Sequence, residues 1–387
     1  MKSLCLRASV FIFQHGGTHS QRFHGVKLMM KNLFSTLIIT CVLIQTQAQN
    51  DSISLSFSGY AETYYAFDFD QPDNHSRPDF IYSHNRSNEV NLNLGLLKAA
   101  YTAPNVRANL ALAAGTYMNA NLAAEPGVLR NIFEANAGVK LGKNSETWLD
   151  AGIFSSHIGF ESAIGKDCWT LTRSLMAENS PYFESGIKVS QYSNDGRWFL
   201  SALVLNGWQR IQRVDGNNTP AFGTQITFKP NENITLNSSS FIGSDKPDDA
   251  RQMRYFHNFY SIFQLDEKWA ATLGFDIGTE QVAKGDNEKN MWYSPVLLLK
   301  YAPGGKWSLT ARAEYYSDEN GVIIMTGTPH GFKTFGYSLN IDYGIRNNAV
   351  WRIEGRAFNS KDNIFTDNNG NASNGNFALT TVLAVSF

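Results

Sequence analysis

The residues best suited to chemistry in this 387-residue chain are arginines and glutamates that alternate along two stretches near its end. Arg312 and Glu314 form one pair, and Arg352, Glu354 and Arg356 form a second group. A spacing of two residues places such side chains on one face of an extended strand. A row of fixed charges can select solutes in a water-filled passage by their charge. The alternative is that the charges neutralise one another beneath a covering segment.

The same alternation supplies further candidates for a polar, inward face. A charge at the centre of a bilayer costs a few kcal/mol, so if the strands cross a membrane these side chains must line a lumen. The additional pore-lining candidates are Glu62, Glu134, Lys140, Asp276 and Asp342. They lie on strand faces opposite apolar residues, as Asp342 lies opposite Ile341.

Sixteen segments with strand-like alternation follow one another from residue 53 to the end of the sequence. They are 53–67, 88–102, 107–117, 130–141, 147–160, 182–193, 197–210, 221–229, 233–243, 253–265, 269–279, 290–301, 307–317, 334–345, 349–359 and 376–387. The connections between them are alternately long and short, as in an up-and-down barrel that crosses a membrane. The sequence therefore predicts an all-β, transmembrane, antiparallel barrel of about sixteen strands.

The final segment, 376–387, predicts how this barrel closes. Leu379 and Val385 fall on its lipid-facing side, and Thr380 and Ala384 on the lumenal side. A terminal aromatic, Phe387, suits the membrane interface, where we expect it beside the start of the first strand at Ile53. Five tryptophans each follow a short turn and are predicted to form an interfacial aromatic girdle: Trp148, Trp198, Trp269, Trp307 and Trp351.

The N-terminal part of the chain is predicted to be an address and not part of the fold. Residues 29–48 combine a basic start at Lys31, an apolar run and small residues before a cleavage site near Ala48, as in a secretory signal peptide. Residues 1–28 resemble an upstream extension, which leaves 49–387 as the barrel. Residues 1–48 contain five basic residues and no acid, so the mature charge is 28 minus 34, about −6. That balance argues against a nucleic-acid partner.

Composition gives little support for an enzyme, a cofactor or a metal site. Cys168 is the single cysteine after residue 48, and no Cys/His metal spacing or phosphate-binding glycine motif is found. The five histidines of the mature chain, at positions 75, 84, 157, 257 and 330, are predicted to be mostly exposed loop residues. A barrel hydrolase would need a nucleophile, a base and an orienting group together. Among the histidines, only His157 lies near the long segment 161–181.

Three stretches resemble the β-barrel porins of the OmpL-like type: Ser174–Gly186, Arg312–Asp318 and Arg352–Arg356. The resemblance covers most of the mature chain and implies an outer-membrane diffusion channel without catalytic residues. In sixteen-stranded porins the third external loop folds into the lumen. By that resemblance, segment 161–181 is expected to form a constriction, and its candidate residues are Lys166, Asp167, Trp169, Arg173 and Glu178. The alternative is an ordinary external loop.

The combined expectation is a passive outer-membrane porin, with no cofactor, that contacts membrane lipid and small hydrophilic solutes and could assemble as a homotrimer. A closed structural or adhesion barrel is the main alternative, because a plugged lumen would give the same strand pattern.

Overall fold

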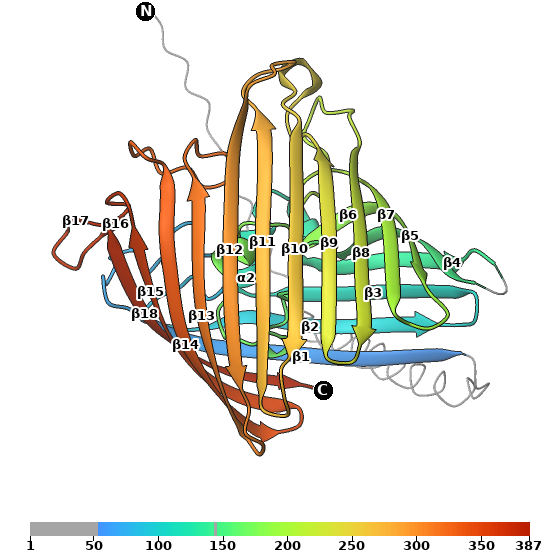
Figure 1. Cartoon of the computed structure of the whole chain (residues 1–387), viewed down its shortest axis with the longest axis horizontal. Helices are drawn as coiled ribbons and strands as arrows, with labels where there is room; N and C mark the ends of the chain where they lie inside the picture. The colour runs from blue at the N-terminus through green and yellow to red at the C-terminus, as the bar shows by residue number, and fades with distance from the viewer. Residues whose placement is uncertain (1–52, 143–144) are drawn as a thin grey trace, which may run out of the picture. The chain divides into compact units, whose positions relative to one another are not determined.

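The computed structural model describes residues 53–142 and 145–387, so the predicted extension 1–28 and signal peptide 29–48 lie outside the described residues. Sixteen strands pair antiparallel, each with the next along the chain, and β18 pairs with β1 to close the barrel (Figure 1). These strands are β1 (Ser54–Asp68), β2 (Val90–Thr102), β3 (Val106–Ala114), β4 (Ile132–Lys140), β5 (Glu146–Ser155), β6 (Phe183–Tyr192), β7 (Trp198–Leu205), β8 (Ala221–Asn231), β9 (Ile234–Gly243), β10 (Arg254–Gln264), β11 (Trp269–Gln281), β12 (Lys289–Tyr301), β13 (Trp307–Asp318), β14 (Phe332–Arg346), β15 (Ala349–Ser360) and β18 (Gly375–Ser386). The predicted number and order of the strands, and the pairing of each strand with its neighbours in the sequence, are confirmed.

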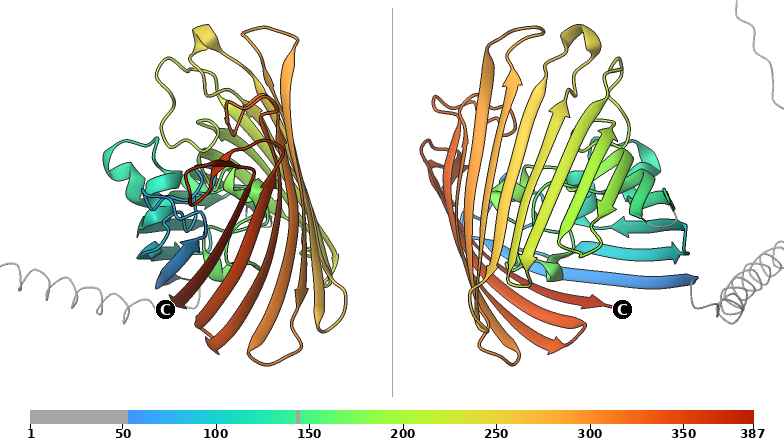
Figure 2. Two further views of the ribbon diagram at one scale, coloured as in Figure 1. Left: turned by 90° about the vertical axis from the view of Figure 1, so that its left-hand side faces the viewer. Right: turned by 45° about the vertical axis from the view of Figure 1, so that its right-hand side comes forward.

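The connections alternate between tight turns at one end of the barrel and long loops at the other, as predicted. The tight turns include 193–197 and 232–233. The long loops that matter below are loop 1 (69–89), loop 2 (115–131), loop 3 (156–182), loop 7 (319–331) and loop 8 (361–374). Loop 8 holds a small separate hairpin made of β16 (Phe365–Thr366) and β17 (Ala372–Ser373). Figure 2 shows the tight turns gathered at one end, on the same side as the C-terminus.

The described helices are short and belong to the loops. They are α2 (Thr116–Asn121), α3 (Leu175–Glu178) and the 3₁₀ turns η1 (Gly127–Asn131), η2 (Gly165–Asp167) and η3 (Asp248–Ala250). Within residues 53–142 and 145–387, none of the helices has the length and apolar character needed to cross a membrane.

Side chains alternate between lumen and exterior along each strand, and this alternation places the polar residues inside. On β13, Thr310, Arg312 and Glu314 are buried, whereas the outward Leu309 is 38% exposed. On β18, Thr380 and Ala384 are buried and Leu379 is 40% exposed, as the sequence predicts. Because side chains on a strand alternate with a period of two, the pairing register determines which residues of the whole strand face the lumen and which face outward.

The seam between the last and first strands differs in one detail from the sequence expectation. Phe387 exchanges two backbone hydrogen bonds with Gly59, and not with the region of Ile53. A Cβ atom at position 59 would lie 2.3 Å from the Phe387 ring, so the ring occupies space that only glycine leaves. The sequence alone could not place this contact, since the stagger between paired strands is set by barrel closure.

Four of the five predicted girdle tryptophans face outward beside the tight turns. Trp269 and Trp307 are 39% and 52% exposed and lie 4.6 Å, centroid to centroid, from Tyr301 and Tyr343. Trp148 is the exception, because it shares the inward face of β5 with Asp150 and lies beneath a cation. The expectation of a lipid-facing Trp148 is wrong, since position after a turn does not determine which face a residue occupies.

Candidate pore constriction

Loop 3 crosses the lumen and is bound to the inner faces of β13, β14 and β15. Three of its backbone N–H groups donate to wall side chains. Leu171 N donates to Asn340 Oδ1 (3.0 Å), Thr172 N donates to Glu354 Oε2 (2.5 Å), and Leu175 N donates to Glu314 Oε2 (2.5 Å). A loop away from water needs a partner for every backbone N–H, and here the wall supplies them.

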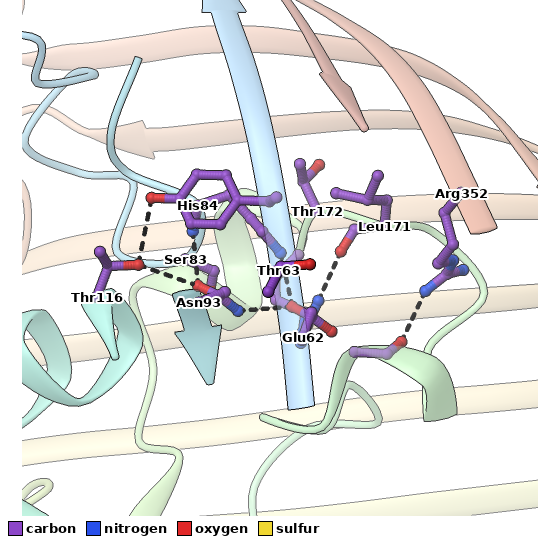
Figure 3. Close-up of polar contacts among 12 residues, drawn as sticks. Glu62, Thr63, Ser83, His84, Asn93, Thr116, Leu171, Thr172 and Arg352 are labelled. Atoms are coloured by element: carbon purple, nitrogen blue, oxygen red, sulfur yellow. Dashed lines mark hydrogen bonds and ion pairs between the residues drawn. The ribbon is translucent and has the colours of Figure 1, made fainter. Parts of the chain in front are cut away.

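The arginines of the same wall bind the loop in the opposite sense, through its carbonyl groups. Arg312 Nη1 donates to the Thr172 carbonyl (2.7 Å). Arg352 donates to the Gly165 carbonyl through Nη1 (2.7 Å) and to the Cys168 carbonyl through Nη2 (2.9 Å). Figure 3 shows Arg352 directed at the helical turn η2 of loop 3. Loop 3 is therefore held by both donors and acceptors of the wall.

These five alternating charges, which we name the covered wall, form a neutralised cluster with Asp342 beneath loop 3. Its members are Arg312, Glu314, Arg352, Glu354 and Arg356, each between 1% and 4% exposed. Arg312 pairs with Glu354 at 3.0 Å, and Arg356 pairs with Glu314 at 2.6 Å. Arg352 pairs with Asp342 at 2.7 Å, so three arginines face three carboxylates. The two alternatives for this row of charges, a selective lining and a neutralised cluster, differ in whether a solute can reach the charges. In the structure the row lies inside the barrel, beneath loop 3.

The five candidate residues of the constriction divide into two sets. Lys166 and Asp167 lie exposed on loop 3 and pair with each other at 3.2 Å, and Trp169 is half-buried with Lys300 5.7 Å from its ring centroid. Arg173 and Glu178 are buried. Lys166, Asp167 and Trp169 are therefore the members of this set that a solute could touch.

Arg173 stabilises the shape of loop 3 itself. Its three guanidinium nitrogens donate to the carbonyls of Ser162, Leu171 and Ala163, at 2.7, 2.7 and 3.0 Å. Carbonyls on both sides of the turn are thereby tied to one planar cation, which suits the fixed fork of an arginine.

Glu178 joins loop 3 to loop 1. Its carboxylate accepts hydrogen bonds from Tyr82 N (2.9 Å) and Ser83 N (3.1 Å). Burial raises the pKa of Glu178 to about 7, against the lowering effect of these donors and of Arg173. The contact between the two loops therefore contains a carboxyl group that titrates near neutral pH.

Glu62 anchors loop 1 to β1 and is itself buried, at 1% exposure. It accepts from His84 Nε2 and Asn93 Nδ2, each at 2.7 Å, and from the Tyr60 hydroxyl. Figure 3 shows His84 and Asn93 converging on Glu62 from two sides. The expectation that His84 is an exposed loop residue is wrong, because loop 1 folds inward.

His157 is also buried, and this bears on the hydrolase alternative. Its Nδ1 contacts Glu184 Oε2 and its Nε2 contacts the Ser240 carbonyl, both at 2.8 Å. Burial alone would lower the pKa of His157, but Glu184 and the Ser240 carbonyl raise it. Since both ring nitrogens are engaged, His157 lacks the free acceptor that a general base needs.

Across the lumen, the inner faces of β2 to β6 carry charges that remain accessible, and we name this the open wall. Lys98 pairs with Glu134 at 2.5 Å, with side chains 31% and 14% exposed. Arg107 pairs with Asp150 at 2.5 Å, with side chains 31% and 5% exposed, so Arg107 is the accessible partner of this pair. Lys188 is half-buried on the same surface.

Strand register explains how these open-wall pairs form. Lys98 and Glu134 lie on either side of Ala111, and Arg107 and Asp150 on either side of Gly138. A Cβ at Gly138 would lie 2.2 Å from Asp150 Oδ1, so glycine leaves room for the Arg107–Asp150 bridge.

Sequence reasoning found Glu134 but missed its partner Lys98, as well as Arg107, Asp150 and Lys188. The alternation of β2 places Lys98 on the inward face. Two leucines on the same face, Leu94 and Leu96, suggested that this face was apolar. Of the other predicted lining residues, Asp276 is buried with Asn258 as its donor (2.5 Å), and Lys140 pairs with Glu146 at 2.6 Å.

Among the described residues, no group of three or more His, Cys, Asp or Glu side chains has the geometry to hold a metal ion. Cys168 is buried in loop 3, where its sulfur accepts from Ser162 N (3.2 Å) and donates to the Ser162 carbonyl (3.3 Å).

A family model described as "Putative beta-barrel porin-2, OmpL-like" matches residues 54–387. A comparison with curated proteins finds no match. Among solved structures, OmpT of Vibrio cholerae in a trimer form superposes with a TM-score of 0.58 at 10% identity, covering 87% of this chain and 100% of OmpT. The anion-selective porin from Comamonas acidovorans gives 0.58 at 8% identity, with 87% and 100% covered. The channel DcaP of Acinetobacter baumannii gives 0.57 at 9% identity, with 88% and 99% covered. At these identities the structural likeness shows a shared fold.

Proposed function

Because the chain belongs to the OmpL-like β-barrel porin family and forms an outer-membrane passive channel, we propose that small hydrophilic solutes diffuse along the open wall, past loop 3. The observation that carries this proposal is the unequal exposure of the two charged walls. Loop 3 covers the inner faces of β13 to β15, so the charges left for a passing solute include those of β2 to β6 together with Lys166 and Asp167. Along this passage, water and fixed charges would then act on the solutes that pass.

The pairing of the accessible charges supports weak selectivity. Lys98 and Arg107 are each matched by a carboxylate, Glu134 and Asp150. Lys188 and Glu184 add one cation and one carboxylate on the inner face of β6, so the formal charges of the open wall balance. We expect weak selectivity between anions and cations.

Single-channel current recorded from refolded protein in a planar bilayer tests the channel. Discrete, ohmic current steps support it. A folded, heat-modifiable barrel that gives no steps would favour the closed structural barrel. Ester hydrolysis that disappears in His157→Ala would instead support the enzyme.

We also infer that the chain assembles as a homotrimer through the outer surface of β2 to β5. On this surface small side chains are interspersed with aliphatic ones such as Leu97, Leu110 and Leu112, whereas β11 to β14 present more aromatic ones. Its outward small residues are Gly95, Ala99, Ala108, Ala114, Ala135, Ala137 and Ala151. By contrast, Tyr293, Tyr315 and Phe335 form a contacting aromatic series on β12 to β14, which suits a lipid interface.

Two matched alanine substitutions test this surface. Ala137 and Ala311 both point outward and are both exposed. Ala137→Phe should reduce the trimer fraction seen by light scattering in detergent, whereas Ala311→Phe should leave it unchanged. Equal effects, or a monomeric wild-type protein, would contradict the assignment.

The targeting of the chain is part of the same proposal. We propose that residues 29–48 direct export and are removed near Ala48. Mass spectrometry of protein purified from outer membranes would show an N-terminus at Gln49 if this is correct, and a retained leader if it is not.

A further inference from the structure

A second polar site lies at the loop end of the barrel, away from the covered and open walls. It is a cavity of about 640 Å³ between loop 1, loop 7 and loop 8. That volume falls within the range of about 300–1,000 Å³ usual for small-molecule sites. Asn179 of loop 3 also lines this cavity, so a solute bound there is in contact with loop 3.

Arg77 of loop 1 lines this cavity as a buried cation with incomplete pairing. The residue is 3% exposed, and its nearest carboxylate oxygen is Asp68 Oδ2, 3.6 Å from Nε. None of its three guanidinium nitrogens has a hydrogen-bond partner among residues 53–142 and 145–387. Buried guanidinium groups ordinarily have their donors satisfied, so this arrangement points to a partner that is not among the described residues.

Three acceptors on the same cavity lining are also without a partner among the described residues: Asp68 Oδ2, Asn179 Oδ1 and Asn376 Oδ1. The amide orientations are fixed by their donor ends. Asn376 Nδ2 donates to Asp68 Oδ1 (2.7 Å) and to Asp70 Oδ2 (2.9 Å), and Asn179 Nδ2 donates to the Leu175 carbonyl (2.9 Å). These polar atoms lie directly beneath the cavity surface, so a ligand would reach the Arg77 donors and the three acceptors through small side-chain shifts.

The loop that carries Arg77 is held firmly. Arg77 N donates to the Asn85 carbonyl (3.0 Å), and Ser76 forms an isolated antiparallel bridge with Arg86. Arg86 also donates to the Asn74 carbonyl (3.0 Å) and to Ser76 Oγ (2.9 Å). A guanidinium set in such a framework is pre-organised for a ligand.

The rest of the lining combines apolar surface with an excess of acid. Phe80, Ile324 and Phe365 supply apolar surface. Asp68, Asp70 and Asp79 line the cavity with Arg77, so the formal balance is three acids minus one base, or −2. The excess acid would repel anionic ligands, and the guanidinium of Arg77 would repel cationic ligands placed beside it.

We propose that this cavity binds a neutral, polyhydroxylated solute, in chemical terms a short oligosaccharide. Each sugar hydroxyl can accept from Arg77 and donate to an oxygen of Asp68, Asn179 or Asn376. The C–H faces of the sugar rings can contact Phe80 and Phe365. The proposal deepens the channel function by naming a solute class, and it rests on that function only for its physiological purpose, since binding itself requires no conduction.

Isothermal titration of the detergent-solubilised full barrel tests the site. The probes are three trisaccharides that differ in charge: maltotriose, trigalacturonate and the chitosan trimer. We expect maltotriose to bind at least several-fold more tightly than either charged probe. Tightest binding of trigalacturonate or of the chitosan trimer would overturn the proposal in favour of an anion or cation site, and binding of none would overturn it outright.

Thr366→Trp places a large side chain in the cavity lining from the exposed hairpin strand β16 and should weaken maltotriose binding roughly tenfold or more. Asn287→Trp, on the exposed loop 282–288, is the matched control and should change nothing. Arg77→Met should also weaken binding, and Thr366→Trp keeps the test decisive if that variant does not fold. Equal affinity of Thr366→Trp and wild type would contradict the site. Absent binding with normal current steps would overturn this proposal alone, whereas binding without current steps would overturn the channel alone.

Discussion

The covered wall and the open wall are built from the same sequence pattern and reach opposite outcomes. In both, charged side chains alternate with apolar ones and point into the barrel. On β13 and β15 these charges are at most 4% exposed, and they bind the backbone of loop 3. On β2 and β3, Lys98 and Arg107 keep 31% of their side-chain surface exposed and are satisfied by one carboxylate each.

The difference shows that an inward charge can be a structural contact or an accessible lining residue, and that a loop decides between them. Buried pairs lose their hydration, so they persist where neighbouring groups satisfy them completely. The covered wall meets most of that condition because loop 3 supplies both carbonyls and N–H groups, whereas Arg312 Nε and Arg356 Nε have no hydrogen-bond partner among the described residues. The open wall needs no such condition because water reaches it.

The largest expected difference between the walls is in stability. Glu354→Gln removes the negative charge that pairs with the buried Arg312. It also weakens the hydrogen bond that Glu354 accepts from Thr172 N. We expect a loss of about 3–5 kcal/mol in the free energy of unfolding. Glu134→Gln removes the same charge from the open wall and should cost about 1 kcal/mol or less, because Lys98 can turn to water.

Urea unfolding of the refolded protein, followed by the electrophoretic shift between folded and unfolded barrel, measures both changes. Equal losses for Glu354→Gln and Glu134→Gln would mean that loop 3 does not depend on the covered wall.

An intermediate effect is expected from pH, through Glu178 on the loop 3 side. Burial raises the pKa of Glu178 from its usual 4.5 to about 7. A group whose pKa is raised on folding contributes stability that is fully present below its unfolded value and is lost as pH rises through its folded value. The contribution is therefore full below about pH 4.5 and lost through pH 7, and it amounts to roughly 1–3 kcal/mol.

Glu178→Gln, which stays neutral, isolates this contribution. The stability of wild type relative to Glu178→Gln should be greater at pH 5 than at pH 8, measured by thermal unfolding. The corresponding comparison with Glu134→Gln serves as the open-wall reference. A relative stability of wild type that increases with pH would contradict the assignment.

The smallest expected effect is in ion selectivity. Lys98→Glu changes the open-wall charge by two, which at ~10 Å in water is worth about 0.8 kcal/mol before screening and about 0.3 kcal/mol after it. The permeability ratio should shift roughly twofold towards cations, read from the reversal potential in a salt gradient. Lys284→Glu, on the exposed loop 282–288, makes the same charge change outside the lumen and should shift it far less.

The fold was predictable from sequence because alternation, turns and loop lengths are local signals. The period of two placed Arg312 and Thr380 inside and Leu309 outside, and the alternation of loops gave the orientation of the strands. The inward path of loop 3 followed from a family resemblance, not from its residues. The prediction for Trp148 was wrong because it used the position of the residue along the strand, whereas the face that a side chain occupies depends on its orientation.

Access to the site was not predictable, because it depends on contacts between segments far apart in the chain. Arg312 and Thr172 are separated by 140 residues, and Glu62 and Gly165 also come from distant segments. A Cβ at Gly165 would lie 2.0 Å from Glu62 Oε2, which is a close approach that no local pattern encodes. The burial of His84 depends on the same folding of loops over the lumen.

The most direct test of the two-wall account is the reaction of a charged thiol reagent with two matched serine-to-cysteine variants while single-channel current is recorded. Ser58 is exposed and pairs with Lys98 of the open wall, whereas Ser338 is 8% exposed and pairs with Arg312 and Arg356 of the covered wall. Both changes are made in a Cys168→Ser background. We predict current steps from both variants and a reagent-induced change in current for Ser58→Cys alone. An equal response of Ser338→Cys, or no current from either folded variant, would contradict the account.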